Sequence, residues 1–360
     1  MRIAVAGAGS FGRNHLRVLR ELETAGLGVV LVAAVEPNAE RAQNTAAQYG
    51  IPVFDSIDKL LAADLNLDAA SVAVPTVHHH AVAAQLLDAG LDLLVEKPLA
   101  ATLAEADDLV ARAERNGRIL QPGHLERFNP AVLAVESRIR RPMFFEAHRL
   151  SVFTPRALDV DVILDLMIHD LDIVLTFANS QIREVRAVGL PIISPRVDIA
   201  NVRVEFESGC VANFTASRVS TEKVRKLRFF EPRQYVSIDY ARRDLLVIRM
   251  DADAGSLPPE ITAALASGKV NPALLAQLAA ANSTGPAPGL SFAKPEVAPG
   301  EPLRLEIESF LESVRTRRQP HVTARQGRAA LELALQIQSA MAAHAERAGL
   351  GNFFTPASTT

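Results

Sequence analysis

The sequence has a single cysteine, Cys210, which excludes an intrachain disulfide. A chain without disulfides fits a reducing compartment, and we expect a cytoplasmic protein. Cys210 follows the turn pair Ser208-Gly209 and precedes a β-rich run. This position is typical of a buried core thiol rather than of a nucleophile.

Long apolar runs and blocks of like charge are also missing. No apolar stretch has the length of a membrane span, and the N-terminus lacks the apolar run and cleavage site of a signal peptide. The formal net charge is only −3, without a basic block that would mark a nucleic-acid surface. We therefore expect neither a membrane nor a nucleic-acid partner.

A metal-binding cluster is not apparent. The run His78-His79-His80 is suggestive, but consecutive residues at a helix start point in different directions. Asp170 and Asp172 lie close to Asp165 in the sequence, but on a helix they would point to other faces. We predict no metal site.

The chain of 360 residues is long enough for two domains with a sizeable core. Residues 1–122 alternate short apolar strands with helices every ~25 residues, a pattern typical of a parallel sheet covered on both faces. The sequence therefore predicts an α/β protein that begins with a doubly wound Rossmann domain.

Residues 123–350 show a different pattern. A helix near 160–178 precedes several β-rich runs with few helices between them, and Ser208-Gly209 is a hairpin signal. We predict an α+β domain with an open, mostly antiparallel sheet, a loop insertion at 251–299 and a tail at 351–360. Apolar alternation in 202–206 and 211–214 exceeds what one helix layer would bury, so we expect a homodimer or homotetramer through the open face.

The segment Gly7-Ala8-Gly9-Ser10-Phe11-Gly12 follows a strand and opens a helix. This context is typical of a loop that binds a dinucleotide: Gly7 permits the turn, Gly9 admits the pyrophosphate, and Gly12 allows close packing of the helix. Glu36 ends the second strand, where a carboxylate accepts from the ribose 2′-hydroxyl. Because a carboxylate repels a 2′-phosphate, NAD is favoured over NADP, although Arg41 is nearby.

Two later segments carry candidate chemistry. Lys97 stands in Glu96-Lys97-Pro98 at the end of a strand of the parallel series, where ligands of such sheets bind. A surface lysine paired with Glu96 is an equal alternative on spacing alone. Asp165 and His169 are four residues apart on an apolar helix, so a general base with an orienting carboxylate is one interpretation and a structural pair is the other.

With these segments the sequence resembles the glucose–fructose oxidoreductase, inositol dehydrogenase and MocA family over nearly its whole length. The motifs that carry the resemblance are Gly7-Ala8-Gly9-Ser10-Phe11-Gly12, Pro75-Thr76-Val77-His78-His79, Glu96-Lys97-Pro98 and Asp165-x-x-x-His169. The family implies an NAD-dependent dehydrogenase, a catalytic Lys97 and His169 with Asp165 beside the substrate, and a cis peptide at Lys97-Pro98. It also implies cofactor contacts from its motif residues, namely Gly7, Gly9, Ser10, Phe11, Gly12, Glu36, Pro75, Thr76, His79, Glu96 and Lys97.

One subgroup of the family is more similar than the rest. Many members have glycines where this sequence has Asp159-Val160-Asp161 and Met167, whereas the run Gly123–Pro130 matches the subgroup that oxidises UDP-N-acetylglucosamine at C3 for diamino-sugar lipid A. This resemblance implies a sugar-nucleotide substrate, and a diphosphate needs cationic partners. The candidate substrate residues are His124, Arg127, Arg149 and Arg156, with Arg218 as a further cation.

Other functions stay open from the sequence. A dehydrogenase of a free sugar or an inositol-like polyol would use the same fold, and so would a non-catalytic NAD-sensing protein. Retention of Lys97, Asp165 and His169 argues against the sensor. We favour His169 as the base, with Lys97 stabilising the developing alkoxide, and a neutral Lys97 acting as the base is the alternative.

Overall fold

The computed structural model of the chain describes residues 1–154, 160–250 and 290–350. The chain divides into two compact units, one formed by Met1–Phe128 with Gly300–Leu335 and the other by Asn129–Pro299 with Gln336–Thr360. The sequence places everything from residue 123 to 350 in the second domain, whereas Gly300–Leu335 groups with the first unit.

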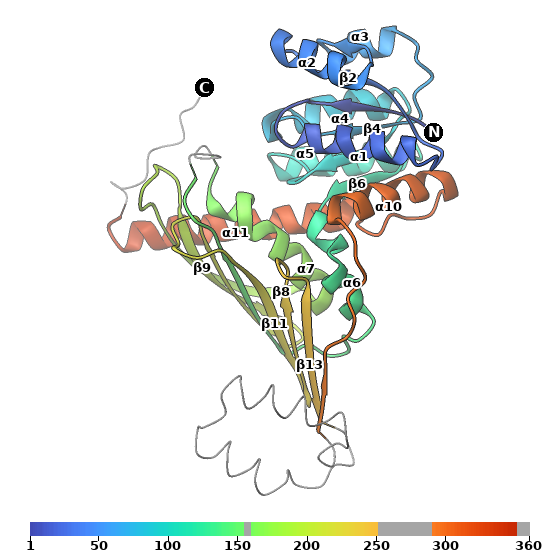
Figure 1. The fold of residues 1–360 in the computed structure, drawn as a ribbon. Helices are drawn as coiled ribbons and strands as arrows, with labels where there is room; N and C mark the ends of the chain where they lie inside the picture. The colour runs from blue at the N-terminus through green and yellow to red at the C-terminus, as the bar shows by residue number, and fades with distance from the viewer. Residues whose placement is uncertain (155–159, 251–289, 351–360) are drawn as a thin grey trace, which may run out of the picture. The chain divides into compact units, whose positions relative to one another are not determined.

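The first unit contains a six-stranded parallel sheet with the order β3-β2-β1-β4-β5-β6 (Figure 1). This order reverses between β1 and β4, and sheets of this kind bind their ligands outside the carboxyl ends of the strands at such a reversal. The central strands are buried on both faces, because their sequences are nearly continuous apolar runs. The strands are β1 Arg2–Ala6, β2 Val30–Val35, β3 Val53–Phe54, β4 Ala69–Val72, β5 Asp92–Glu96 and β6 Leu120–Gly123.

Six α-helices of the first unit connect or cover this sheet. They are α1 Gly12–Thr24, α2 Ala39–Tyr49, α3 Ile57–Ala62, α4 His79–Asp88, α5 Leu103–Arg115 and α10 Pro302–Thr316. Helix α10 packs beside α1, and its apolar side chains Ile307 and Phe310 share one core cluster with Leu16 and Leu19. Replacing a buried Phe such as Phe310 by Ala typically costs about 3–5 kcal/mol, so this shared core explains why α10 groups with the first unit.

The second unit contains an eight-stranded sheet with the order β14-β13-β12-β11-β7-β10-β9-β8. Only the pair β7 and β10 is parallel, so the predicted mostly antiparallel sheet and the α/β fold class are confirmed. The strands are β7 Phe144–Leu150, β8 Ile182–Leu190, β9 Ile199–Phe206, β10 Val211–Ser217, β11 Val224–Glu231, β12 Gln234–Asp239, β13 Asp244–Met250 and β14 Leu290–Ala293. The helices of the second unit include α6 Pro130–Glu136 and α7 Ile168–Ala178, and α11 Ala324–Arg347 begins in the first unit and ends in the second.

The alternating residues of β9 and β10 do not leave an apolar face open. Val202, Val204, Phe206, Ala212 and Phe214 are all buried within the chain. The opposite face carries polar side chains, among them Asn201 and Arg203, which are exposed. The apolar alternation therefore gives no reason for oligomerisation, and the expected homo-oligomer stays a prediction.

The predicted insertion at 251–299 divides into two parts. Residues 251–289 lie outside the described part of the chain, as do the predicted tail at 351–360 and Arg156. Leu290–Ala293, which the sequence assigns to the loop, instead forms β14 and pairs with β13. A four-residue edge strand of this kind is too short to be distinguished from a loop by its pattern.

Cys210 is buried, and burial raises the pKa of its thiol to about 11. The prediction of a core thiol is confirmed, because such a thiol forms little thiolate.

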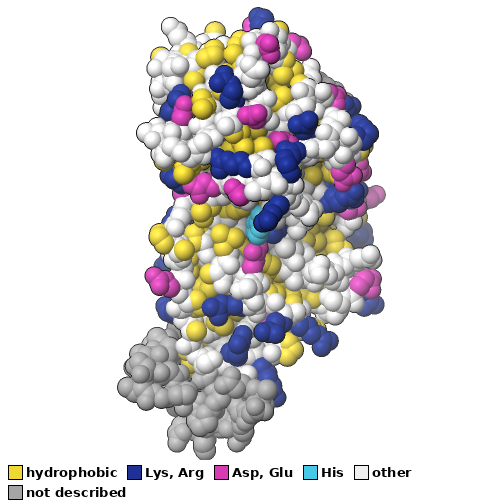
Figure 2. Space-filling view, turned by 90° about the vertical axis from the view of Figure 1, so that its right-hand side faces the viewer, with side chains coloured by type: hydrophobic (Ala, Val, Ile, Leu, Met, Phe, Trp, Pro, Cys, Tyr) yellow, Lys and Arg dark blue, Asp and Glu magenta, His cyan; other side chains and the backbone are white. Residues whose placement is uncertain are grey.

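Across residues 1–154, 160–250 and 290–350, no helix is long and apolar enough to span a bilayer. On the upper half of the face in Figure 2, basic and acidic side chains are interspersed, whereas basic side chains predominate in the lower half. The near-neutral total charge does not reveal this local asymmetry.

Candidate active site

The glycine-rich loop runs from the end of β1 into α1, and each of its glycines has a different role. Gly7 has φ +95°, and a Cβ there would lie 2.6 Å from the carbonyl oxygen of Ala73. A Cβ on Gly12 would lie 1.9 Å from the carbonyl oxygen of Gly7. At Gly9, by contrast, no atom of the described chain lies within 4 Å of the added Cβ. The fold itself thus requires Gly7 and Gly12, whereas the open space at Gly9 suits a ligand that approaches the backbone.

The start of α1 suits an anion. Phe11 is the N-cap residue and is partly exposed, and within the described chain no side chain caps this end. The first turn contains no acidic residue. The amides of Arg13 and Asn14 donate to the carbonyls of Gly9 and Phe11. The positive end of the helix dipole lies at this loop, as a pyrophosphate site requires.

Glu36 directly follows β2 and is only 3% exposed. Its Oε2 accepts from the Ala8 amide at 3.1 Å, and its Oε1 accepts from the Asn38 amide at 2.9 Å and from Arg41 at 2.8 Å. Burial acts to raise the pKa of Glu36, but the hydrogen bonds from Arg41 and the two amides outweigh it, so the pKa lies below its usual value.

The carboxylate of Glu36 is therefore ionised and attached to the phosphate loop. A carboxylate accepts at roughly four positions, and the three donors in the described residues leave one, on Oε2. This remaining position fits a ribose hydroxyl. The role of Glu36 as an NAD ligand stays a prediction, which its position after β2 and its ionised carboxylate support.

The Pro75-Thr76 segment follows β4, where Thr76–His78 form a short 3-10 helix (η1). His79 begins α4 and is buried, with Nδ1 2.8 Å from the carbonyl oxygen of Pro98 and Nε2 2.9 Å from that of Val74. Burial lowers the pKa of His79. Both ring nitrogens face backbone oxygens, so we assign His79 a role in holding the ends of β4 and β5 rather than in contacting the cofactor.

Lys97 follows β5 and is half-buried, and the peptide bond between Lys97 and Pro98 is cis, as the resemblance implies. The carboxylate of Glu96 accepts from His15 Nε2 at 3.0 Å and from the Lys97 backbone amide at 3.2 Å. Glu96 is therefore bound to protein groups on both oxygens.

Asp165 and His169 lie in the second unit at the start of its long helical segment, and both are half-buried. Ile163–Met167 form a π-helix (η3), in which the Ile168 amide bonds to the Ile163 carbonyl, and α7 begins at Ile168. The sequence assumes a regular α-helix from 160 to 178, and that assumption is wrong here because a π turn is wider than an α turn. π turns of this kind are frequent at functional sites.

Asp161, which the sequence does not single out, fixes the beginning of this segment. Its Oδ1 accepts from the amides of Ile163 and Leu164 at 3.0 and 3.1 Å, and its Oδ2 contacts Gln338 of α11. The signal was present in the sequence, since an aspartate directly before a helical run, which here begins at Val162, is a typical N-cap.

The predicted substrate cations are mostly engaged in the fold. Arg149 is 3% exposed and binds Asp170 through Nε at 2.7 Å and Nη2 at 2.9 Å, and it lies over the Tyr240 ring. Arg218 donates to the Val160 carbonyl at 2.6 Å and lies near Asp198. A guanidinium that is buried and paired in this way is not available to a diphosphate, so we withdraw Arg149 and Arg218 as phosphate ligands. His124 and Arg127 are buried in the first unit.

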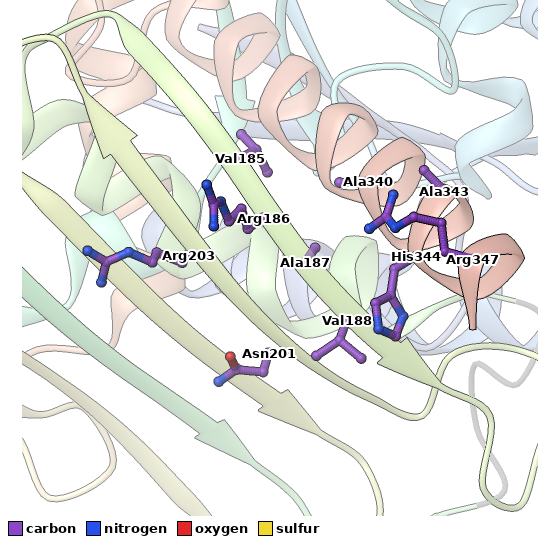
Figure 3. Close-up of a pocket in the computed structure, with 10 residues that line it drawn as sticks. All are labelled: Val185, Arg186, Ala187, Val188, Asn201, Arg203, Ala340, Ala343, His344 and Arg347. Atoms are coloured by element: carbon purple, nitrogen blue, oxygen red, sulfur yellow. The ribbon is translucent and has the colours of Figure 1, made fainter.

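A separate pocket of about 530 Å³ lies on the second unit (Figure 3). It is lined by β8, β9 and the end of α11, with Arg186, Arg203, His344 and Arg347 around it. None of the predicted site residues lines this pocket. Among the residues that the structure describes, no three His, Cys, Asp or Glu side chains are grouped to hold a metal ion.

Comparison with known proteins agrees with this geometry. The profile of the oxidoreductase family with an NAD-binding Rossmann fold matches residues 1–124, and that of the GFO/IDH/MocA C-terminal domain matches residues 131–233. The chain belongs to the Gfo/Idh/MocA family and is an NAD-dependent dehydrogenase by class.

Among its relatives, UDP-N-acetylglucosamine 3-dehydrogenase from Acidithiobacillus ferrooxidans is 33% identical over 96% of this chain and 99% of its own length. A solved structure of that enzyme covers 95% of this chain and 98% of its own, with a TM-score of 0.80. The scyllo-inositol 2-dehydrogenase of Bacillus subtilis is 28% identical over 61% of this chain and 68% of its own. A Bordetella pertussis dehydrogenase crystallised with NADH and UDP-GlcNAcA shares the fold at 16% identity and a TM-score of 0.72, covering 95% of this chain and 96% of its own.

Proposed function

We propose that this protein oxidises the C3 hydroxyl of UDP-N-acetylglucosamine to the 3-keto sugar. The observation that carries the proposal is the similarity to the Acidithiobacillus ferrooxidans enzyme, which extends over both units. Similarity to the inositol dehydrogenase covers about three fifths of the chain, which favours the sugar nucleotide over a free polyol.

The residues of the first unit fit NAD. The open space at Gly9 and the uncapped start of α1 suit the pyrophosphate, and Glu36 suits the adenosine ribose. When bound, NAD⁺ accepts the hydride that leaves the carbinol carbon.

The protein must remove the hydroxyl proton as charge develops on the oxygen. We assign this step to His169, because histidine is the side chain that most often serves as a general base, and we assign to the Lys97 ammonium the stabilisation of the developing alkoxide. In the alternative, a neutral Lys97 takes the proton and His169 donates a hydrogen bond. In either version the secondary alcohol loses one hydride and one proton and becomes a ketone.

The decisive experiment uses UDP-N-acetylglucosamine carrying deuterium at C3. We expect one deuterium in the reduced cofactor and a nucleotide-sugar product lighter by the transferred deuterium and one proton, both measured by mass spectrometry. Deuterium retained in a product that is nevertheless oxidised would place the reaction at another carbon. Turnover of scyllo-inositol but not of the nucleotide sugar would establish the polyol alternative, and no turnover of either with NAD⁺ bound would support the sensor.

Variants separate the two assignments of the base. Lys97→Ala and His169→Ala should bind NAD⁺ normally but lose at least ~100-fold in kcat. Lys97→Arg discriminates between them, because arginine cannot deprotonate. Substantial activity of Lys97→Arg would support the electrostatic role of Lys97, and near-complete inactivity would make Lys97 the base.

A further inference from the structure

Three polar residues of the first unit are buried although the proposed chemistry does not use their side chains. Ser71 on β4, His15 on α1 and Glu96 on β5 are 1%, 0% and 7% exposed. Burying polar groups costs free energy unless they are hydrogen-bonded to one another. These three residues are bonded in a single chain.

The direction of the hydrogen bonds in this chain follows from the chemistry of its members. Glu96 Oε1, as a carboxylate oxygen, accepts from His15 Nε2 at 3.0 Å, so the imidazole carries a proton on Nε2. When the ring carries only that proton, His15 Nδ1 accepts from the Ser71 hydroxyl at 2.8 Å. Every polar atom of the imidazole is then satisfied.

The chain of hydrogen bonds ends at the backbone of Lys97. Glu96 Oε2 accepts from the Lys97 amide at 3.2 Å, so the carboxylate is held on one side by His15 and holds the lysine backbone on the other. The space around the carboxylate is tight, since a Cβ on Gly123 would lie 2.9 Å from Glu96 Oε1. The close approach of Glu96 to this strand therefore requires glycine at position 123.

The residue at the centre of this chain also belongs to the cofactor loop. His15 is three residues beyond Gly12 on α1, and the Phe11 ring lies 5.4 Å from its ring, centroid to centroid. One imidazole thus connects the helix that starts at the phosphate loop with the turn that carries Lys97.

We propose that His15 is a positioning residue for Lys97, acting through the carboxylate of Glu96. The proposal rests on the proposed function, in which Lys97 is a catalytic residue. Without His15 the carboxylate loses its fixed donor, and the Lys97 backbone loses a fixed acceptor. The binding of the cofactor by Glu36 and the glycine-rich loop does not depend on this chain of hydrogen bonds.

The kinetic test compares His15→Ala with His15→Gln. Misplacing a reacting group by about 1 Å can cost ~100-fold, so we expect kcat of His15→Ala to fall about 10- to 100-fold, with the KM for the nucleotide sugar and the Kd for NADH within about threefold of wild type. The glutamine Nε2 can replace the imidazole Nε2 as donor to Glu96, so His15→Gln should recover most of kcat. His80→Ala is the matched control, because it removes a histidine–carboxylate pair of the same unit, with Asp108, at 2.7 Å. It should behave as wild type.

A second readout does not require turnover. The chain has only six lysines, so protein carrying ¹³C at the lysine ε carbon gives a simple spectrum, in which Lys97→Arg identifies the Lys97 signal. We expect His15→Ala to change the shift and the pH midpoint of this signal, His15→Gln to restore both, and His80→Ala to leave both unchanged. If wild type does not oxidise the nucleotide sugar but this pattern is found, the proposed function fails and the role of His15 stands.

The result that overturns the proposal is a folded His15→Ala with wild-type kcat and an unchanged Lys97 signal. A fall in kcat that His15→Gln and the control share would overturn it as well. If His15→Ala does not fold, Ser71→Ala carries the test, because it removes only the donor to His15 Nδ1. It should then change the Lys97 signal in the same direction by a smaller amount, and no change would refute the proposal.

Discussion

Buried charged side chains near the candidate site have different hydrogen-bond partners in the two units. In the first, buried carboxylates accept hydrogen bonds from the backbone of the segments that would touch the cofactor, as Glu36 does with Ala8 and Glu96 with Lys97. In the second, the buried Arg149 and Asp170 pair with each other, and the buried Asp198 accepts from the amides of 192–194, a segment without a predicted site residue. A buried carboxylate thus points to function when the backbone that it holds belongs to the candidate site, and otherwise to stability.

The largest expected effect tests the second half of this comparison. Asp170→Asn leaves the Arg149 guanidinium buried without its counter-charge, which typically costs about 3–5 kcal/mol of the free energy of unfolding. Urea denaturation measures this. The double variant Arg149→Met with Asp170→Asn should recover part of the loss, since no charge is then left unpaired. A loss below about 1 kcal/mol in Asp170→Asn would mean that Arg149 is free to serve a ligand after all.

Two glycines of the phosphate loop test whether the first unit binds the cofactor at the loop that Glu36 holds. The Cβ of Gly12→Ala would lie 1.9 Å from a backbone oxygen, so this variant should lose about 1–3 kcal/mol of stability and bind NADH weakly. Gly9→Ala meets no atom of the described chain, so its melting temperature should stay near wild type while its Kd for NADH rises at least about tenfold. Calorimetric titration and thermal denaturation separate the two effects. Equal loss of stability in both variants would contradict the assignment of Gly9 to the ligand.

The sequence predicted the first unit better than the second for a physical reason. The turn at Gly7, the start of α1 and the position of Glu36 depend on local backbone geometry, which residue types reveal directly. The π turn at Ile163–Met167 depends on packing against β10, and the grouping of α10 with the first unit depends on a core shared with residues some 290 positions earlier, around Leu16. Neither contact leaves a periodic signal.

For the candidate site, too, the sequence indicates residues that have a local signal and misses residues that depend on contacts in the fold. Lys97, Glu36 and the glycines were found because each stands where a strand ends. His15 was missed because it lies on the apolar face of α1 beside Leu16 and Leu19, where a histidine is easily taken for a core residue. The substrate arginines were selected by charge alone, and Arg149 shows why charge is a weak guide.

The pH dependence of stability tests whether the charge of the Glu36 carboxylate stabilises the first unit. Its pKa in the folded protein is lowered, so its stabilising contribution is present above its ordinary pKa and is lost as the pH falls through the folded-state value. Glu36→Gln should therefore lower stability at neutral pH by roughly 1–3 kcal/mol and close this gap with wild type in acid. Denaturation curves from neutral pH downward measure the gap. Glu36→Gln should also bind NADP⁺ better relative to NAD⁺, and a gap that stays constant with pH would show that the carboxylate charge has no part in it.

The smallest expected effect concerns Asp161, a half-buried carboxylate of the second unit that accepts from backbone amides, as Glu36 and Glu96 do in the first. It accepts from the amides that open the π turn carrying Asp165. Asp161→Ala removes an N-cap and should cost about 0.5–2 kcal/mol, whereas Asp161→Asn keeps the Oδ1 acceptor and should lose only part of that. If the cap also orients the segment that carries Asp165 and His169, kcat should fall in Asp161→Ala by more than in Asp161→Asn, with the Kd for NADH unchanged in both. Stability loss without any change in kcat would leave Asp161 a structural cap, and the comparison would then hold without exception: carboxylates that shape a functional segment would be confined to the first unit.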